Sequence, residues 1–153
     1  MYKKMMVPLD GSELAECVLP HVEAFITGFR IAEIVFVRVL EPMTISTSAG
    51  PHMLDDLKER ESAREASARE YLNQVVERIK HDGTKMQTVI LNGRVAERLS
   101  DYSGKNDIDI ILIATHGRSG VTRWVRGSVA DKILRSANLP VLMVRAPGTK
   151  GGI

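Results

Sequence analysis

Residues 108–120 read Ile-Asp-Ile-Ile-Leu-Ile-Ala-Thr-His-Gly-Arg-Ser-Gly, and this stretch decides the fold. Its first part, Ile108–Ala114, is an apolar run rich in isoleucine, with little alternation between apolar and polar residues. Such a run predicts a strand that is buried on both faces, as in a parallel sheet. The glycine-rich segment after it predicts a loop at the carboxyl end of that strand.

Four further apolar runs are spread along the chain, at Met5–Leu9, Ile34–Leu40, Met86–Leu91 and Pro140–Val144. Segments with helical spacing separate the runs, so strands and helices alternate from the first run to the last. Strict alternation predicts βαβ units with right-handed crossovers, and therefore an α/β fold with a parallel sheet.

The predicted helices differ in the apolar surface that they carry. In the first, apolar residues recur every three or four positions from Leu14 to Phe29, with Ser12 as the N-cap and a kink at Pro20. The second, Leu54–His81, has an apolar stripe only in its second half. Its charged first half is typical of a solvent-exposed face, and the alternative is a surface for a partner.

Two shorter helices and one long loop complete the pattern. Apolar residues mark the third helix (Val95, Leu99, Tyr102) and the fourth (Val129, Ile133, Leu134). The loop Glu41–Met53 is long for its position beside the end of a strand, which suits either a binding loop or a flexible connection.

Length and composition define the class of protein. The chain has 153 residues, 44% of them hydrophobic and 26% charged, which is typical of one globular domain. We expect that domain to span residues 1–146, with a disordered tail at 147–153. The net charge of +2 gives no reason to expect a nucleic acid or a membrane surface as partner.

Other classes are excluded by what the sequence lacks. One cysteine, Cys17, permits neither an intrachain disulfide nor a thiolate zinc cluster, and the four histidines have no metal-ligand spacing. No apolar run approaches the length that spans a bilayer. The apolar segment that ends at Pro8 is too short for a signal peptide, so we expect a cytoplasmic protein.

The loop after Ala114 has the residue types of a phosphate site. Gly117 allows close approach of the backbone, and Gly127-Ser128 directly precedes the fourth helix, where Ser128 and Asp131 match a capping box. Free N–H groups and the helix dipole favour phosphate there, and nearby arginines add positive charge (Arg118, Arg123, Arg126). A glycine-rich turn with an ordinary N-cap is the alternative interpretation.

Asp10 occupies the matching position after the first strand, in the segment Val7-Pro8-Leu9-Asp10-Gly11-Ser12. Its carboxylate has two candidate roles, which are to accept hydrogen bonds from a ribose or adenine, or to cap its own turn. The chain has neither a P-loop nor a Gly-x-Gly-x-x-Gly motif after the first strand.

Three separated segments together resemble the universal stress protein family. They are Val-Pro-Leu-Asp-Gly-Ser at residues 7–12, Ile-Ala-Thr-His-Gly-Arg-Ser-Gly at 113–120 and Gly-Ser-Val-Ala-Asp-Lys-Ile-Leu at 127–134. The resemblance covers Lys3 to Arg145. It implies a three-layer α/β/α fold of the Rossmann-like, adenine nucleotide alpha hydrolase-like type. The implied sheet has five parallel strands in the order 3-2-1-4-5, which places the loops after strands 1 and 4 at one switch point.

The resemblance is to the nucleotide-binding branch, whose motif is Gly-x-x-Gly, nine residues, then Gly-Ser or Gly-Thr. Ala114 stands where the motif has its first glycine, and Gly117, Gly127 and Ser128 match the rest. The match implies that Pro8, Asp10 and Val39 contact the base or ribose. It also implies that Ile113 and Ala114 flank the ribose and phosphates, and that the phosphate chain is held by Gly117, Arg118, Gly127, Ser128 and Val129.

The function implied by this resemblance is binding of ATP, or of ADP or AMP, by a stress-response sensor. Mg²⁺ is expected to reach the site with the nucleotide and to meet Ser128. Two alternatives stay open, a slow ATPase and an interaction protein of the same fold that binds no nucleotide. The family also implies a homodimer that forms through the last strand, Pro140–Val144.

Overall fold

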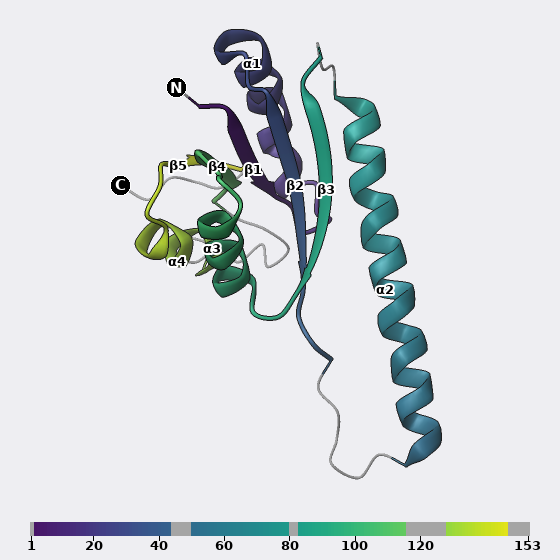
Figure 1. Cartoon of the computed structure of the whole chain (residues 1–153). Helices are drawn as coiled ribbons and strands as arrows, with labels where there is room; N and C mark the ends of the chain where they lie inside the picture. Colours follow the sequence, from purple (N-terminus) through teal and green to yellow (C-terminus); the bar gives the residue numbers. More distant parts are fainter. Residues whose placement is uncertain (1, 44–49, 80–82, 116–127, 147–153) are drawn as a thin grey trace.

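A computed structural model of the chain describes residues 2–43, 50–79, 83–115 and 128–146 (Figure 1). The predicted tail 147–153 lies outside these residues. Strands and helices alternate along the chain, and a short 3-10 helix, η1, directly precedes the first α-helix. The elements are β1 (Lys4–Pro8), η1 (Ala15–Val18), α1 (Leu19–Phe29), β2 (Glu33–Leu40), α2 (Pro51–Arg78), β3 (Lys85–Asn92), α3 (Val95–Lys105), β4 (Ile110–Ala114), α4 (Ser128–Ser136) and β5 (Val141–Val144).

The five strands form one parallel sheet in the order β3-β2-β1-β4-β5, which confirms the predicted fold class. Each predicted apolar run overlaps one of the strands, because a run of branched side chains suits a strand with both faces covered. The chain moves outward from β1 to β3 and then crosses over to β4 on the other side of β1. The central pair β1–β4 is therefore the switch point of the sheet.

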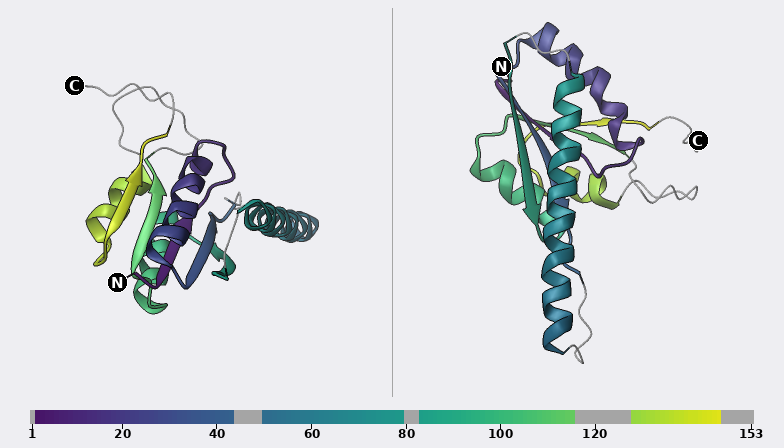
Figure 2. Two further views of the ribbon diagram at one scale, coloured as in Figure 1. Left: turned by 90° about the horizontal axis from the view of Figure 1, so that it is seen from above. Right: turned by 90° about the vertical axis from the view of Figure 1, so that its right-hand side faces the viewer.

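Each face of the sheet is covered by its own pair of helices (Figure 2). Met5 and Val7 of β1 pack with residues of α1 and α2, whereas Met6 of the same strand packs with α3 and α4. Neighbouring strand residues thus enter two separate cores. This arrangement is the three-layer α/β/α architecture. The helices cover the two faces of the sheet, so the ends of the strands are where loops can form a site.

The start of the first helix differs from the sequence expectation. The segment begins as the 3-10 turn η1, and the α-helix starts only at Leu19. Pro20 therefore lies in the first turn of α1, where a missing N–H breaks no intrahelical hydrogen bond, so the predicted kink is wrong. Ser12 makes the hydrogen bonds of an N-cap, but for the turn that leads into η1 and not for α1: its hydroxyl accepts from the Ala15 N–H at 3.2 Å and its carbonyl accepts from the Glu16 N–H at 3.3 Å.

Helix α2 is the longest element and extends past the sheet (Figure 1). It begins at Pro51 rather than at the predicted Leu54, because proline is favoured at the first helical position. Only its second half enters the core, through Ala68, Leu72 and Val75. Its first half is exposed, as the charge pattern predicted, and the Arg69–Glu65 ion pair at 2.9 Å is of the i,i+4 kind.

The amino-terminal segment is fixed to the start of β4 by a side chain. The Asp109 carboxylate accepts hydrogen bonds from the backbone N–H groups of Lys3 and Lys4, each at 2.8 Å. These two bonds are the main causes that hold the pKa of Asp109 below its ordinary value, against an opposing effect of burial. Asp109 therefore stabilises the pairing of β1 with β4 from the amino end of the sheet.

Candidate functional site

The carboxyl ends of three neighbouring strands bring candidate residues to one level of the sheet. Pro8 is the register partner of Val37, and Met6 is the register partner of Ile111. Asp10 lies two residues beyond the end of β1, and the same offsets extended past the strand would set it level with Val39 of β2 and with Thr115, the residue after β4. Because β1 and β4 form the switch point, this edge is where ligands bind in open α/β sheets.

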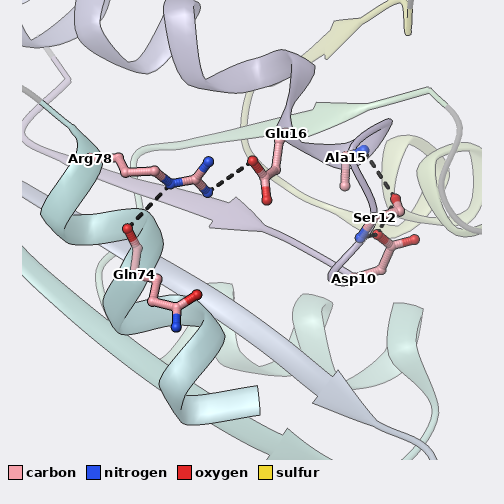
Figure 3. A network of polar contacts seen from close by, with 6 residues as sticks. All are labelled: Asp10, Ser12, Ala15, Glu16, Gln74 and Arg78. Atoms are coloured by element: carbon pink, nitrogen blue, oxygen red, sulfur yellow. Dashed lines mark hydrogen bonds and ion pairs between the residues drawn. The ribbon is translucent and has the colours of Figure 1, made fainter. Parts of the chain in front are cut away.

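Asp10 holds the turn after β1. Its Oδ1 accepts a hydrogen bond from the Ser12 N–H at 2.9 Å and one from the Ser12 hydroxyl at 2.6 Å (Figure 3). Gly11 between them has φ +83°, a backbone conformation that favours glycine. The turn-capping role of Asp10 is thus present in the structure, and its half-buried carboxylate still lies at the edge of the sheet.

Arg38 packs against this turn from β2. Its guanidinium lies so close to Gly11 that a β-carbon there would be 3.2 Å from Cζ and would overlap Nη1. On α2, the Tyr71 ring also faces this guanidinium, with 5.9 Å between Cζ and the ring centroid. Sequence reasoning missed both residues. The available signal was that Arg38 is the one charged residue in the apolar run Ile34–Leu40.

A charged cluster connects the turn to α2 (Figure 3). Glu16 of η1 accepts an ion-paired hydrogen bond from Arg78 at 2.9 Å, and Arg78 also donates to the Gln74 carbonyl at 3.3 Å. Burial, together with the carboxylates of Glu16 and Asp10, raises the pKa of Tyr71, while Arg38 acts to lower it. The buried Tyr71 hydroxyl has no partner at hydrogen-bonding distance in the described part of the chain.

The structure places seven of the ten predicted site residues. Pro8, Ile113 and Ala114 are buried at the ends of β1 and β4, whereas Asp10 and Val39 are half-buried. On α4, Ser128 is the first residue and Val129 is half-buried. The other three predicted residues lie outside the described residues; they are Gly117, Arg118 and Gly127. The side chain of Ser128, on which the predicted capping box depends, is also outside what the structure describes.

Cysteine and metal-binding side chains are the other candidates for a functional group. Burial raises the pKa of the Cys17 thiol, which makes it a poor nucleophile. Within residues 2–43, 50–79, 83–115 and 128–146, no three His, Cys, Asp or Glu side chains are grouped as metal ligands. In the same residues, no helix combines the length and apolar character needed to cross a membrane.

The chain belongs to the universal stress protein family, whose family model matches residues 1–145. Among named relatives, Universal stress protein MJ0577 of Methanocaldococcus jannaschii is 30% identical over 156 aligned positions, which cover 95% of this chain and 96% of the relative. Universal stress protein YxiE of Bacillus subtilis is 24% identical, with 95% of this chain and all of the relative covered.

Solved structures share the fold over almost the whole chain. The MJ0577 structure superposes with a TM-score of 0.82 at 25% identity and covers 97% of this chain and 99% of its own. An Arabidopsis thaliana family member with AMP bound has a TM-score of 0.60 at 16% identity, covering 95% and 93%. A universal stress protein in complex with cAMP has a TM-score of 0.65 at 15% identity, covering 95% and 98%.

Proposed function

We propose that this protein binds ATP or a related adenine nucleotide at the carboxyl ends of β1 and β4 and acts as a stress-response sensor in the cytoplasm. One observation carries the proposal. The carboxyl ends of β1, β2 and β4 are neighbours at the switch point of a parallel sheet, and Asp10, Val39 and Thr115 lie at or just past those ends. The AMP-bound and cAMP-bound family members support the choice of an adenine nucleotide as ligand.

The base and ribose would occupy the edge formed by β2, β1 and β4. The Asp10 carboxylate would accept hydrogen bonds from ribose hydroxyls, and the Val39 backbone would meet the adenine edge. Pro8 and Ile113, which are buried at the ends of β1 and β4, would supply the apolar walls of the site. This mixture of apolar walls and a few polar groups is typical of small-molecule sites.

The phosphates would lie toward the start of α4. The free N–H groups at a helix N-terminus favour anions, and Ser128 and Val129 are the first two residues of this helix. Gly117, Arg118 and Gly127 would complete the phosphate site. Ala114, which replaces a motif glycine, packs in the core on the α1 side of the sheet, so its methyl group already has a place in the fold.

Mg²⁺ would enter with the nucleotide rather than bind the protein alone. Magnesium favours several oxygen ligands and keeps some of its waters, so phosphates and one hydroxyl suffice as its contacts. Ser128 is the residue whose hydroxyl would contribute. The described residues hold no group of three acidic or histidine side chains that would form an independent metal site.

We also propose that the protein is a homodimer joined through β5. This strand pairs with β4 alone among the described strands, so it is an edge of the sheet. Exposed edge strands favour pairing with another copy of the same strand across a two-fold axis.

Calorimetric titration with Mg-ATP, ADP and AMP tests the proposed function. We expect saturable binding of at least one of the three, and mass spectrometry of material released from the denatured native protein should identify the adenine compound that copurifies. A titration that produces no heat up to millimolar concentrations of every nucleotide would contradict the proposal. The interaction protein that binds no nucleotide would then be the remaining candidate.

A further inference from the structure

We propose that Arg38 is a positioning residue of this site, because its guanidinium lies between Gly11 and the Tyr71 ring and holds the Asp10–Ser12 turn in its binding conformation. This inference rests on the proposed function, since it assigns the turn to nucleotide binding. Arg38 acts through the turn and is not assigned a contact with the ligand.

The packing at Gly11 carries the first step. The backbone there has φ +83° and leaves no room for a β-carbon, because the Arg38 guanidinium occupies that space. Glycine in isolation samples many backbone conformations, so an unsupported turn here would lose entropy whenever a ligand ordered it. A guanidinium packed directly on the glycine removes those alternatives before any ligand arrives.

The second step is the support behind Arg38. The Tyr71 ring, with its centroid 5.9 Å from Cζ, presents an aromatic face toward the cation. Tyr71 belongs to the half of α2 that enters the core, and Arg78, about two helical turns further on, is paired with Glu16. The guanidinium therefore lies against a helix that packs in the core and is also ion-paired to η1, the element that follows the turn.

Charge is the third step. The carboxylates of Glu16 and Asp10 both act to raise the pKa of Tyr71, after burial, whereas the Arg38 guanidinium acts to lower it. In the proposed complex, the negative charge of the Asp10 carboxylate would be repelled by the phosphates of the nucleotide. The Arg38 cation reduces that repulsion while the planar guanidinium fixes the turn.

The experiment compares Arg38→Met with Arg98→Met as a matched control. Arg98 packs on Gly93 (φ +134°) with Nε 2.6 Å from the position of a β-carbon, and it donates to the Asn92 carbonyl at 2.7 Å. This is a second arginine on a glycine turn, at the end of β3 and outside the proposed site. Each variant therefore removes an arginine that packs on a glycine of positive φ after the carboxyl end of a strand, so the two differ in whether that turn belongs to the proposed site.

Two readouts separate the inference from the proposed function. The first is amide hydrogen exchange in the nucleotide-free protein, where Arg38→Met should raise exchange at Ser12 and Ala15 about tenfold and Arg98→Met should leave both unchanged. The second is nucleotide affinity by calorimetry, which should fall about tenfold in Arg38→Met only, since an unfixed turn must be ordered on binding. If the wild type binds no nucleotide, the proposed function fails whatever the exchange data show.

Two further variants make the test decisive. Arg38→Lys keeps the charge but not the planar contact, so its Ser12 exchange should resemble that of Arg38→Met. Protection restored by lysine would overturn the packing argument, and so would unchanged exchange or unchanged affinity in Arg38→Met. Should Arg38→Met fail to fold, Tyr71→Leu removes the aromatic support while Arg38 remains, and unchanged Ser12 exchange there would contradict the inference.

Discussion

Asp10 caps a turn in the structure, and in the proposed function it also binds the ligand, so substitutions must separate the two roles. Asn at position 10 keeps an oxygen that accepts the Ser12 hydrogen bonds but loses the charge. We expect Asp10→Asn to lower nucleotide affinity about tenfold and to lower stability less than Asp10→Ala does, since charged acceptors form the stronger hydrogen bonds but the asparagine oxygen still accepts from Ser12. Asp10→Ala should lose affinity and also about 1 kcal/mol of stability. Calorimetry and thermal unfolding measure both, and full affinity in Asp10→Asn would restrict Asp10 to the turn.

Asp109 predicts a pH dependence at the opposite edge of the sheet. Its pKa is held below the ordinary 3.8 by the N–H groups of Lys3 and Lys4, so the charged form stabilises the folded state. That contribution is complete above about pH 3.8 and is lost as the pH falls through the lowered pKa. We expect Asp109→Asn to cost about 0.5–1 kcal/mol at pH 7, a figure reduced by solvent exposure, and the difference from wild type to close in acid.

Urea unfolding at pH values from 7 to 3 measures this difference. Asp107→Asn is the control, because Asp107 is exposed two residues away and asparagine tolerates its positive φ of 54°. A constant gap between wild type and Asp109→Asn at all pH values would show that geometry, not charge, is responsible.

Pro20 makes a prediction about helix α1. A proline that kinked the helix would destabilise it by about 3 kcal/mol, so its replacement by alanine would stabilise the protein. In the first turn, Pro20 instead restricts the unfolded chain at no cost to the helix. We therefore expect Pro20→Ala to destabilise the fold by about 0.5 kcal/mol in urea unfolding. A gain in stability would instead show that Pro20 destabilises the helix, as a proline in the helix interior does.

The elements were largely predictable because their signals are local. The apolar run Ile108–Ala114 predicts a buried strand whatever the rest of the chain does, and β4 lies within it. The start of α1 was missed because a 3-10 turn before Leu19 is decided by how η1 packs under the sheet, as the buried Ala15 and Val18 show. The spacing of apolar residues along the sequence does not predict that packing.

The candidate site was predictable only where it follows from strand order. Once β1 and β4 are neighbours, Asp10 must lie at the switch point, and the family resemblance supplied that order. The charge of Arg38 within an apolar run was the one signal, but its contact with Tyr71 joins β2 to α2 and depends on tertiary packing, which the sequence pattern does not specify. Gly117, Arg118 and Gly127 remain predictions, since they lie outside the described residues.

At the scale of the whole molecule, the two edge strands of the sheet, β3 and β5, differ in their surroundings. On one side, α2 packs beside β3 and extends past it, so that edge adjoins a long charged helix (Figures 1 and 2). On the other side, β5 pairs with β4 and then leads into the last described residues of the chain. The edge at β5 is thus the better candidate for pairing between two copies of the sheet.

A charge on β5 tests this pairing. Leu142 lies in the middle of the strand with 38% of its surface exposed, and lysine there would face its own copy across a two-fold axis. Like charges in paired strands repel, so we expect Leu142→Lys to convert a wild-type dimer to monomer in light scattering at micromolar concentration. Leu134→Lys is the control, because Leu134 on α4 is 46% exposed and lies outside the edge strand. A monomeric wild type, or equal dissociation of both variants, would exclude β5 as the dimer contact.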